Sequence, residues 1–564
     1  MIPLLTTKQM LQLEHHAIHE RGISAHILME NAGRTAVQLL YHLHHEQRMD
    51  LARSDVIVLA GSGGNGGDAA VVARYLHQRG VRTELWAARK DSAKRQETVF
   101  HFDAARAEHV PLRCCAETMD AFKDRLKNLT ENDVIVDGLL GTGLRQKPSD
   151  YSANLISHMN ASRALRVSLD VPSGMDADNC VVPDSGKEIF IVQADYTVTF
   201  GWPKFGLCSY PGSMFAGEVY VADIGLSNPL TIPEGPRLTM LDSSVMTRFF
   251  APREPYMHKG LNGHLFVLGG SVGMMGAASL VVEAALQVGL GRCTVVLPEH
   301  CNDSVFVSRC PEATTMHYPA NSPREARSLI LGKTDGNSVL VIGPGMRLDE
   351  PTVLLVRDIL ENTSLPVVVD ASGLRAMADR LDILVTRAHL GRPTIVTPHP
   401  GEAGTMLGVS ARAIQADRMF SMRELIRRTE STVVLKGNRT IIGCPGKHGP
   451  DPNIAVVPTG NGAMGSGGMG DALAGMLGAM LCTDNPAYDT ACAAAFWHGL
   501  AGDRLASQAP DGTVLRATDV IAELNHTKKD MRTDMRRSWP LYPLLPCFWQ
   551  NPSGPPKTLL YPTC

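Results

Sequence analysis

Short apolar runs, each followed by a glycine-rich turn and a stretch with helical spacing, recur along most of the chain. In the first half they are 55–61 (DVIVLAG), 82–88, 133–138, 165–172, 195–201 and 218–223. Runs that are apolar at nearly every position are typical of strands buried on both faces, as in a parallel sheet covered by crossover helices. This rhythm constrains the fold more than any other feature and predicts an α/β protein.

The same rhythm resumes after a polar, proline-containing stretch. The second group comprises 264–270 (HLFVLGG), 293–298, 338–345, 366–372, 393–402, 432–437 and 439–443. Because 564 residues exceed what one core usually accommodates, we predict two α/β domains, 1–228 and 238–526, joined by a linker at 229–237. From 527 on, a charge run and proline-rich sequence without helix or strand period predict a poorly ordered tail, 527–564.

Composition excludes several classes of protein. A net charge of −3 gives no basic surface for nucleic acid. The twelve cysteines are scattered without a CxxC pair, which indicates a reduced, cytoplasmic protein and no zinc site. No stretch reaches eighteen uncharged apolar residues, and Glu14, His15 and His16 interrupt the beginning, so we expect neither a membrane span nor a signal peptide.

The first domain carries a glycine loop between a predicted strand and a predicted helix. Gly61, Gly63 and Gly66 satisfy GxGxxG. Bare backbone lets amide N–H groups approach an anion, and the helix N-terminus adds about half a positive charge. A dinucleotide fold of the Rossmann type also wants an acid at the end of the second strand, whereas Glu84 lies inside that strand. An NAD-dependent dehydrogenase is therefore only weakly supported.

Two further loops, 137–147 and 170–178, also follow strands of the first domain. Loops at the carboxyl ends of parallel strands can converge on one crevice. Each acidic residue taken alone could be a turn or helix-cap residue. Together the loops would assemble an oxygen-rich site suited to a hard cation such as K⁺, Mg²⁺ or Ca²⁺ from Asn65, Asp68, Asp137, Asp170 and Ser173.

The second domain has glycine loops at several strand ends but no Walker-type GxxxxGK[ST] motif. Its most glycine-rich segment, 461–475 (NGAMGSGGMGDALAG), leaves a single carboxylate, Asp471, where a helix is expected to begin. Phosphoryl-transfer sites can use this arrangement, with backbone amides on a phosphate and one carboxylate as the base for a hydroxyl. The motif alone allows a sugar or vitamin kinase.

The motifs of the first domain, GGNGGDAAVVAR, DGLLGTGLRQ and LDVPSGMDAD, resemble the NAD(P)H-hydrate epimerase family, with Gly64 where the family usually has Asn. The resemblance implies a Rossmann-like doubly wound sheet and a K⁺ ion held by Asn65, Asp137 and Ser173. It also implies that the hydrate is bound by Gly64, Asn65, Gly66, Gly67, Asp68, Gly141, Thr142, Gly143, Leu144, Arg145, Gln146, Lys147 and Asp170. Which of Asp68, Asp137 and Asp170 moves the proton stays open.

The motifs of the second domain, HKGLNGHLFVLGGSVGMMGAASL, VIGPGM, TPHPGEAGTMLG and GSGGMGDALAGML, resemble the NAD(P)H-hydrate dehydratase family, whose fold is ribokinase-like. The resemblance implies that Ala277, Gly345, His399 and Asp471 face the hydrate. It implies that the nucleotide is bound by Lys436, Gly437, Asn438, Arg439, Thr440 and Gly470. ADP as co-substrate, Mg²⁺ as its cofactor and a homo-oligomeric assembly are further implications.

The two resemblances on one chain support each other. One activity interconverts the R and S hydrates of NADH and NADPH, and the other dehydrates the S epimer. The alternatives are a small-molecule kinase fused to a nucleotide-binding domain, and a nucleotide sensor without activity.

Overall fold

The structure is a computed structural model, and it describes residues 1–89, 95–144, 147–179, 190–229, 237–250, 255–446, 451–483, 485–510, 512–536 and 548–549. The chain forms two compact units. One contains Pro3–Pro236 with Pro540–Cys564, and is the N-terminal domain below. The other contains Arg237–Trp539 with Met1–Ile2, and is the C-terminal domain. The predicted linker at 229–237 lies almost wholly outside the described residues.

The N-terminal domain is built on an eight-stranded sheet of order β19-β8-β7-β6-β5-β2-β3-β4, in which every pair except β19–β8 is parallel. Its strands are β2 (Asp55–Ala60), β3 (Arg82–Ala87), β4 (Leu112–Cys114), β5 (Val134–Gly138), β6 (Leu165–Leu169), β7 (Tyr196–Phe200), β8 (Glu218–Ala222) and β19 (Phe548–Trp549). Its helices are α1 (Thr7–His19), α2 (Ala25–His45), α3 (Gly64–Gln78), α4 (Gln96–Ala107), α5 (Met119–Lys127), α6 (Asp150–Ala161), α7 (Phe205–Cys208) and α8 (Ser213–Ala216). The predicted Rossmann-like doubly wound sheet is confirmed.

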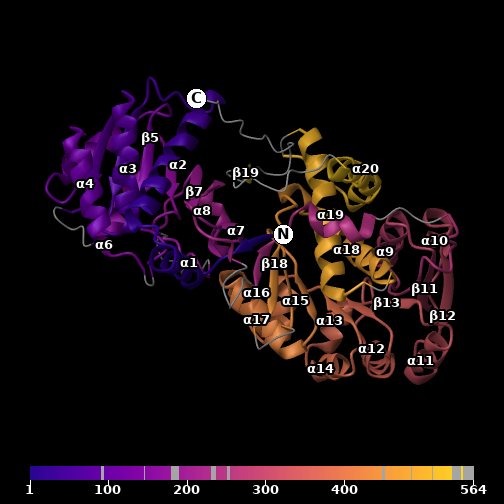
Figure 1. The fold of residues 1–564 in the computed structure, drawn as a ribbon. Coiled ribbons are helices and arrows are strands. Elements are labelled where there is room, and N and C mark those ends of the chain that lie inside the picture. The colour runs from indigo at the N-terminus through magenta and orange to yellow at the C-terminus, as the bar shows by residue number, and fades with distance from the viewer. Residues whose placement is uncertain are drawn as a thin grey trace. The chain divides into compact units, whose positions relative to one another are not determined.

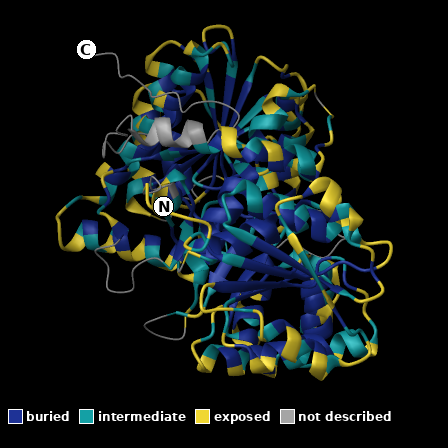
Figure 2. Cartoon of the chain, turned by 90° about the vertical axis from the view of Figure 1, so that its right-hand side faces the viewer, coloured by how far each residue is buried: buried dark blue, intermediate teal, exposed yellow. Residues whose placement is uncertain are grey.

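Helices cover both faces of this sheet. Val56 and Val58 of β2 pack in one core with residues of α1, α2 and α3, whereas the alternating Ile57 and Leu59 pack in a second core with α5 and α6. Figure 2 shows the strands as buried and the outer faces of the helices as exposed. Burial on both faces explains why these strands are apolar at nearly every position.

The C-terminal domain has an eleven-stranded sheet of order β1-β9-β18-β17-β16-β15-β14-β13-β10-β11-β12. From β12 to β16 all neighbours are parallel, and β17 is antiparallel to β16 and β18. The strands are β1 (Ile2–Leu4), β9 (Leu238–Met240), β10 (His264–Leu268), β11 (Arg292–Pro298), β12 (Thr314–Tyr318), β13 (Ser338–Ile342), β14 (Val367–Val369), β15 (Thr394–Val396), β16 (Thr432–Leu435), β17 (Ile441–Cys444) and β18 (Asn453–Val456).

The helices of this domain begin and end as follows, and Figure 1 labels most of them. They are η2 (Ser243–Phe250), α9 (Met275–Gln287), α10 (Ser304–Arg309), α11 (Pro323–Leu331), α12 (Glu350–Asn362), α13 (Ser372–Met377), α14 (Asp382–His389), α15 (Pro400–Leu407), α16 (Ala411–Ala416), α17 (Arg418–Thr429), η3 (Gly462–Met464), α18 (Met469–Leu481), α19 (Ala487–Gln508) and α20 (Ala517–Arg536). Helices α9, α18, α19 and α20 share one apolar core with the sheet.

One local prediction is wrong. The sequence predicts no helix from 527 on, whereas α20 continues to Arg536. The charge run at 528–537 is composed largely of Lys, Arg, Met and Asp, and the first three have high helix propensity. A helix already packed through Val520 and Leu524 extends into such residues without further nucleation.

The strand order reverses once in each domain, between β2 and β5 and between β10 and β13. Ligands of open α/β sheets bind in the crevice outside the carboxyl ends of the strands at such points. In the N-terminal domain the predicted glycine loop follows β2, and in the C-terminal domain glycines follow both β10 and β13, whereas the glycine-rich segment 461–475 follows β18. The fold therefore directs attention to one crevice in each domain.

Candidate functional sites

The glycines of the N-terminal crevice serve two different purposes. A Cβ atom on Gly61 would lie 1.9 Å from the Leu139 carbonyl oxygen, and one on Gly66 would lie 2.0 Å from the Gly61 oxygen. These glycines allow the β2–α3 turn and the loop after β5 to pack directly against each other. By contrast, a Cβ on Gly63 or Gly143 would meet nothing within 4 Å. These two positions border open space, where backbone can approach a ligand.

Asn65, Asp137 and Ser173, the predicted cation ligands, meet around the backbone of Leu140. The Asn65 amide nitrogen donates to the Leu140 and Leu169 oxygens, both at 2.9 Å, and its Oδ1 is buried without a partner in the described structure. The Ser173 hydroxyl accepts a hydrogen bond from the Leu140 amide at 2.8 Å. The structure thus brings these three side chains together and leaves one buried oxygen unsatisfied.

Asp137 is fully buried and saturated with hydrogen bonds. Its carboxylate accepts from the Ser173 amide at 2.8 Å, the Ser173 hydroxyl at 2.5 Å and the Ser168 hydroxyl at 2.9 Å. Burial raises the pKa of Asp137, and the bonds from Ser173 and Ser168 oppose that rise. Asp137 does not line the pocket described next, so it is unsuited to exchange a proton with a substrate there.

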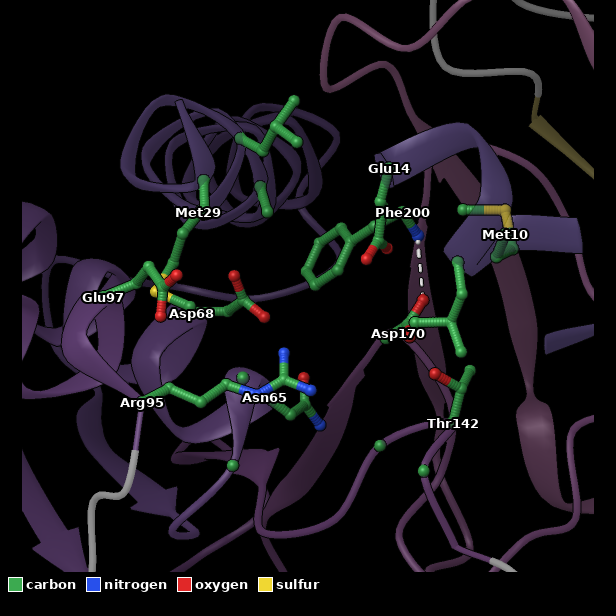
Figure 3. Close-up of a pocket in the computed structure, with 18 of the residues that line it drawn as sticks. Met10, Glu14, Met29, Asn65, Asp68, Arg95, Glu97, Thr142, Asp170 and Phe200 are labelled. Atoms are coloured by element: carbon green, nitrogen blue, oxygen red, sulfur yellow. Dashed lines mark hydrogen bonds between the residues drawn. The ribbon is translucent and has the colours of Figure 1, made fainter. Parts of the chain in front are cut away.

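A cavity of about 640 Å³ opens above these loops (Figure 3). Eight of the predicted hydrate-binding residues line it, namely Gly64, Asn65, Asp68, Gly141, Thr142, Gly143, Leu144 and Asp170. Gly66 and Gly67 pack beneath the loop; a Cβ on Gly67 would lie 2.4 Å from the Met29 sulfur. Lys147 is not part of the lining, and its ammonium lies 4.9 Å from the centre of the Phe190 ring. Arg145 and Gln146 fall outside the described residues.

Asp170 is held firmly at the edge of this cavity. Its backbone has a φ of +64°, which is unusual for a residue with a side chain. Its Oδ1 accepts from the Lys204 ammonium at 2.5 Å and from the Phe200 amide at 3.2 Å. Lys204 is only 1 % exposed and also donates to the Thr199 hydroxyl and the Phe200 oxygen, both at 2.9 Å. The ion pair fixes the carboxylate and neutralises its charge.

Sequence reasoning missed several charged residues of the pocket. Glu14 comes from α1, Arg95 and Glu97 from the start of α4, and Lys204 from the loop after β7. None lies in a glycine loop, which was the signal followed. Lys204 stands just beyond a predicted strand end, within GWPKFG. Asp170 was predicted as a site residue because it stands at the end of another strand, so the same signal could have found Lys204.

The crevice of the C-terminal domain brings Ala277 and Gly345 together. Gly345 has a φ of +65°, and a Cβ there would lie 2.4 Å from the Met274 oxygen and 3.1 Å from the Ala277 Cβ. The Ser271 hydroxyl donates to the Gly345 oxygen at 2.9 Å. The turns after β10 and β13 are therefore in direct contact, and Ala277 is at the first turn of α9.

Beside them lies a cluster of charge that the sequence predicted only in part. The Lys436 ammonium lies 2.7 Å from an Asp370 oxygen and 3.8 Å from a Glu402 oxygen. A Cβ on Gly470 would lie 3.3 Å from the same ammonium. Asp370, Glu402 and Lys436 follow β14, β15 and β16, and Asp471 is in the first turn of α18. Asp370 and Glu402 were missed because neither stands beside a glycine–aspartate motif.

Asp471 has the electrostatics of a base for neutral pH. Burial and the neighbouring Asp370 raise the pKa of Asp471 to about 6; Lys436 opposes this rise, and Glu402 adds to it. Burial lowers the pKa of Lys436, but Asp370, Glu402 and Asp471 together hold it above its usual value. Lys436 is therefore a cation among carboxylates, and the raised pKa of Asp471 suits it to take up a proton near neutral pH.

His399 has a structural role that the sequence did not predict. It is the N-cap of α15, where its Nδ1 accepts from the Gly401 amide at 3.0 Å, and its own amide donates to Glu402 at 2.9 Å. Its side chain is 49 % exposed, and its Nε2 lies 3.4 Å from Glu402 Oε1. His399 therefore orients Glu402 toward Lys436 and remains accessible to a ligand.

The 436–440 turn connects β16 to the antiparallel β17. Gly437 and Asn438 are exposed, the Thr440 hydroxyl donates to the Gly437 oxygen at 2.9 Å, and the Arg439 guanidinium donates to the Pro458 oxygen at 2.7 Å. An exposed turn with glycine backbone, next to Lys436 and Gly470, is a suitable surface for a nucleotide phosphate.

Within the residues that the structure describes, no helix is both long and apolar enough to cross a bilayer. Nor do the described His, Cys, Asp and Glu side chains include a group of three or more that could hold a metal ion by themselves.

The two crevices define the class of protein: a two-domain α/β enzyme with a glycine-lined, carboxylate-bearing site at the switch point of each sheet. Residues 265–525 match the family model described as NAD(P)H-hydrate dehydratase, and residues 25–206 match the model described as YjeF-related protein N-terminus. The chain belongs to the family of bifunctional NAD(P)H-hydrate repair enzymes.

Relatives match along nearly the whole chain. The bifunctional NAD(P)H-hydrate repair enzyme Nnr of Moorella thermoacetica is 31 % identical over 94 % of this chain and 98 % of its own length. The enzyme of the same name from Escherichia coli is 32 % identical over 92 % of this chain and 93 % of its own. Among solved structures, the ADP/ATP-dependent NAD(P)H-hydrate dehydratase of Bacillus subtilis is 27 % identical, covering 52 % of this chain and 98 % of that one, with a TM-score of 0.42.

Proposed function

We propose that this protein repairs hydrated NADH and NADPH. The N-terminal domain interconverts the R and S hydrates, and the C-terminal domain dehydrates the S epimer with ADP, giving AMP, phosphate and the reduced dinucleotide. One observation carries the proposal. This chain belongs to the repair-enzyme family and contains two crevices, each of which brings together residues from the motifs of one of the two activities.

In the C-terminal domain Asp471 acts as the base. It takes the proton from the hydroxyl of the hydrate as that oxygen attacks the terminal phosphorus of ADP and AMP leaves. The C6–O bond then breaks with its electron pair on oxygen, which releases phosphate, and loss of a proton from C5 to solvent forms the C5–C6 double bond of the reduced nicotinamide. Lys436 stabilises the neighbouring carboxylates, and the amides at the start of α18 face the phosphate. Ala277, Gly345 and His399 form the hydrate side of the crevice.

Two cations belong to this proposal. K⁺ suits the oxygen-only set of Asn65, Asp137 and Ser173, and the buried, unpartnered Asn65 Oδ1 supports this assignment. K⁺ would hold the loops after β2, β5 and β6 in place under the hydrate. Mg²⁺ usually binds through substrate phosphates with one or two carboxylates, so it would arrive with the nucleotide. That mode agrees with the lack of a pre-formed acidic metal cluster in the described residues.

We also propose a cytoplasmic location and a homo-oligomer. The cysteines in the described residues are all free thiols, as expected in a reducing compartment. Light scattering of the purified protein tests the second point, with a monomer as the contradicting result.

Recovery of reduced-nicotinamide absorbance tests the function. Each purified epimer of hydrated NADH is supplied with ADP or ATP, with and without Mg²⁺ and K⁺. We expect the S epimer to be converted directly, and the R epimer only through prior epimerisation. A stable phosphorylated product without recovery of NADH would instead establish a small-molecule kinase. No reaction of either epimer with either nucleotide would exclude the repair function.

A further inference from the structure

The pocket of the N-terminal domain holds more acid than a single proton-shuttling Asp requires. Glu14, Asp68, Glu97 and Asp170 all line it, and Arg95 and Lys204 are its cations. Figure 3 shows the carboxyl groups of Glu14, Asp68 and Asp170 directed into the same space. Glu14 belongs to α1 and precedes the residues 25–206 that match the N-terminal family model, so the family match assigns it no role.

Hydrogen bonding separates these carboxyl groups into two kinds. Asp170 is paired with Lys204 and bonded to the Phe200 amide. In the described part of the chain, neither Glu14 nor Asp68 has a hydrogen bond or ion pair to its carboxyl group, although Asp68 is only 9 % exposed. The Asp170 carboxylate is therefore fixed by two partners, whereas the carboxyl groups of Glu14 and Asp68 have none among the described residues.

The electrostatic environment agrees with this division. Burial raises the pKa of Asp68 well above its usual value, Asp170 and Glu14 raise it further, and Arg95 and Lys204 oppose them. Burial and Asp170 likewise raise the pKa of Glu14, again against Lys204 and Arg95. Burial and neighbouring like charges thus act in the same direction on both groups and favour a proton in this part of the pocket.

We propose that Asp68 carries a proton and delivers it to the hydroxyl leaving C6 of the hydrate, with Glu14 as a nearby carboxylate in the same pocket, while Asp170 is the base for the returning water. This inference rests on the epimerase function proposed above. Asp68 is the catalytic acid and Asp170 the catalytic base. Glu14 is a positioning residue, because its negative charge keeps the proton on Asp68.

The reaction balances without any further reagent. The C6–O bond breaks with its electron pair on oxygen, the proton from Asp68 makes that oxygen water, and the ring nitrogen forms a planar iminium. Water then adds to C6 from the other face and transfers a proton to the Asp170 carboxylate. Passage of that proton back to Asp68 through solvent restores the site, so one turnover changes only the configuration at C6.

The test uses the full-length protein, one purified hydrate epimer and no ADP, with the other epimer measured by chromatography against an enzyme-free blank. We expect Asp68→Asn to lower kcat by roughly 10²–10⁴-fold. Glu14→Gln should lower kcat about tenfold at neutral pH and move the alkaline limb of the pH–rate profile to lower pH, as the charge effect of one nearby carboxylate implies. Glu14→Asp should restore part of both effects.

The matched control is Glu20→Gln, also a glutamate of this N-terminal segment, whose side chain is 64 % exposed and outside the pocket. It should leave rate and profile unchanged. Two results would overturn the inference. One is a pH–rate profile of Glu14→Gln identical to that of the wild type, and the other is a kcat of Asp68→Asn within twofold of the wild-type value. A wild type that dehydrates the S epimer yet never epimerises would contradict the epimerase function itself. Urea unfolding of each variant, compared with the wild type, verifies that the N-terminal domain is folded. If Glu14→Gln is unfolded, the shift must appear in Glu14→Asp.

Discussion

Replacement of Asp471 by Asn should have opposite effects on activity and on stability. Asp471 is placed at the start of α18 among Asp370, Glu402 and Lys436. Burial, Asp370 and Glu402 raise its pKa from 3.8 to about 6, against the opposing effect of Lys436. Loss of a general base lowers a rate by roughly 10²–10⁴-fold, so Asp471→Asn should reduce S-hydrate dehydration by that factor. Epimerisation, which uses the N-terminal domain, should not change.

The stability effect follows from the same pKa. Because the pKa is higher in the folded state than in the unfolded state, folding favours the protonated carboxyl, and ionisation destabilises the fold. This destabilisation is absent below pH 3.8, grows as the pH rises and is complete above about 6. The rise in pKa corresponds to about 3 kcal/mol at most, and solvent screening of a half-buried group reduces this to about 1–2 kcal/mol. Asp471→Asn should increase the free energy of unfolding by that amount at pH 7.5 and by almost nothing at pH 4.

Urea unfolding at the two pH values and initial dehydration rates at pH 7.5 measure both effects. Asp382→Asn is the matched control, because Asp382 is 63 % exposed, and its hydrogen bond to Arg380 lowers rather than raises its pKa. It should keep the full rate and gain no stability. Full activity of Asp471→Asn would show that Asp471 is not the base and is only a residue of the first turn of α18. A lower stability of this variant than of the wild type at pH 7.5 would refute the electrostatic reasoning.

The other predictions concern pH, a lysine, a glycine and a cation. The kcat of dehydration should fall about tenfold per pH unit below pH 6, as Asp471 becomes protonated, whereas an unperturbed carboxyl would show no fall above pH 5. Lys436→Met should abolish dehydration and leave epimerisation intact, because it removes the cation that faces three carboxylates. Gly66→Ala should lower epimerisation more than roughly 100-fold by displacing the loop at Gly61, while Gly63→Ala, with open space around it, should change it little; equal effects would contradict the packing argument. Asn65→Leu should remove the dependence of epimerisation on K⁺, measured by replacing KCl with choline chloride.

Most strands could be predicted from the sequence because each is an apolar run followed by glycine, proline or aspartate. The switch points depend on the strand order, which the sequence did not predict. The short strand β4 has no such run, and its place at the edge of the sheet comes from tertiary pairing. The glycine–aspartate segment was predicted well, since α18 begins two residues before Asp471.

The sites were predictable only where their residues stand next to the loops. Glu14 reaches the N-terminal pocket from α1, and no local pattern marks it as a neighbour of Asp170; Lys204 follows a predicted strand end, but no motif singles it out. The role of Asp137 was equally hidden, because only the bonds from Ser168 and Ser173 show that it is a saturated, buried group. Sequence spacing predicts which loops converge, and packing decides which side chains face the cavity.

The division of the N-terminal glycines into packed and open positions also marks where this pocket can be redesigned. Gly61, Gly66 and Gly138 admit no side chain without moving backbone, so a library that varies them would mostly yield unfolded loops. At Gly64, a Cβ would meet only one guanidinium nitrogen of Arg95, at 3.4 Å. Together with Gly63 and Gly143, which border open space, Gly64 is therefore a position where a new side chain can enter the cavity and leave the scaffold intact.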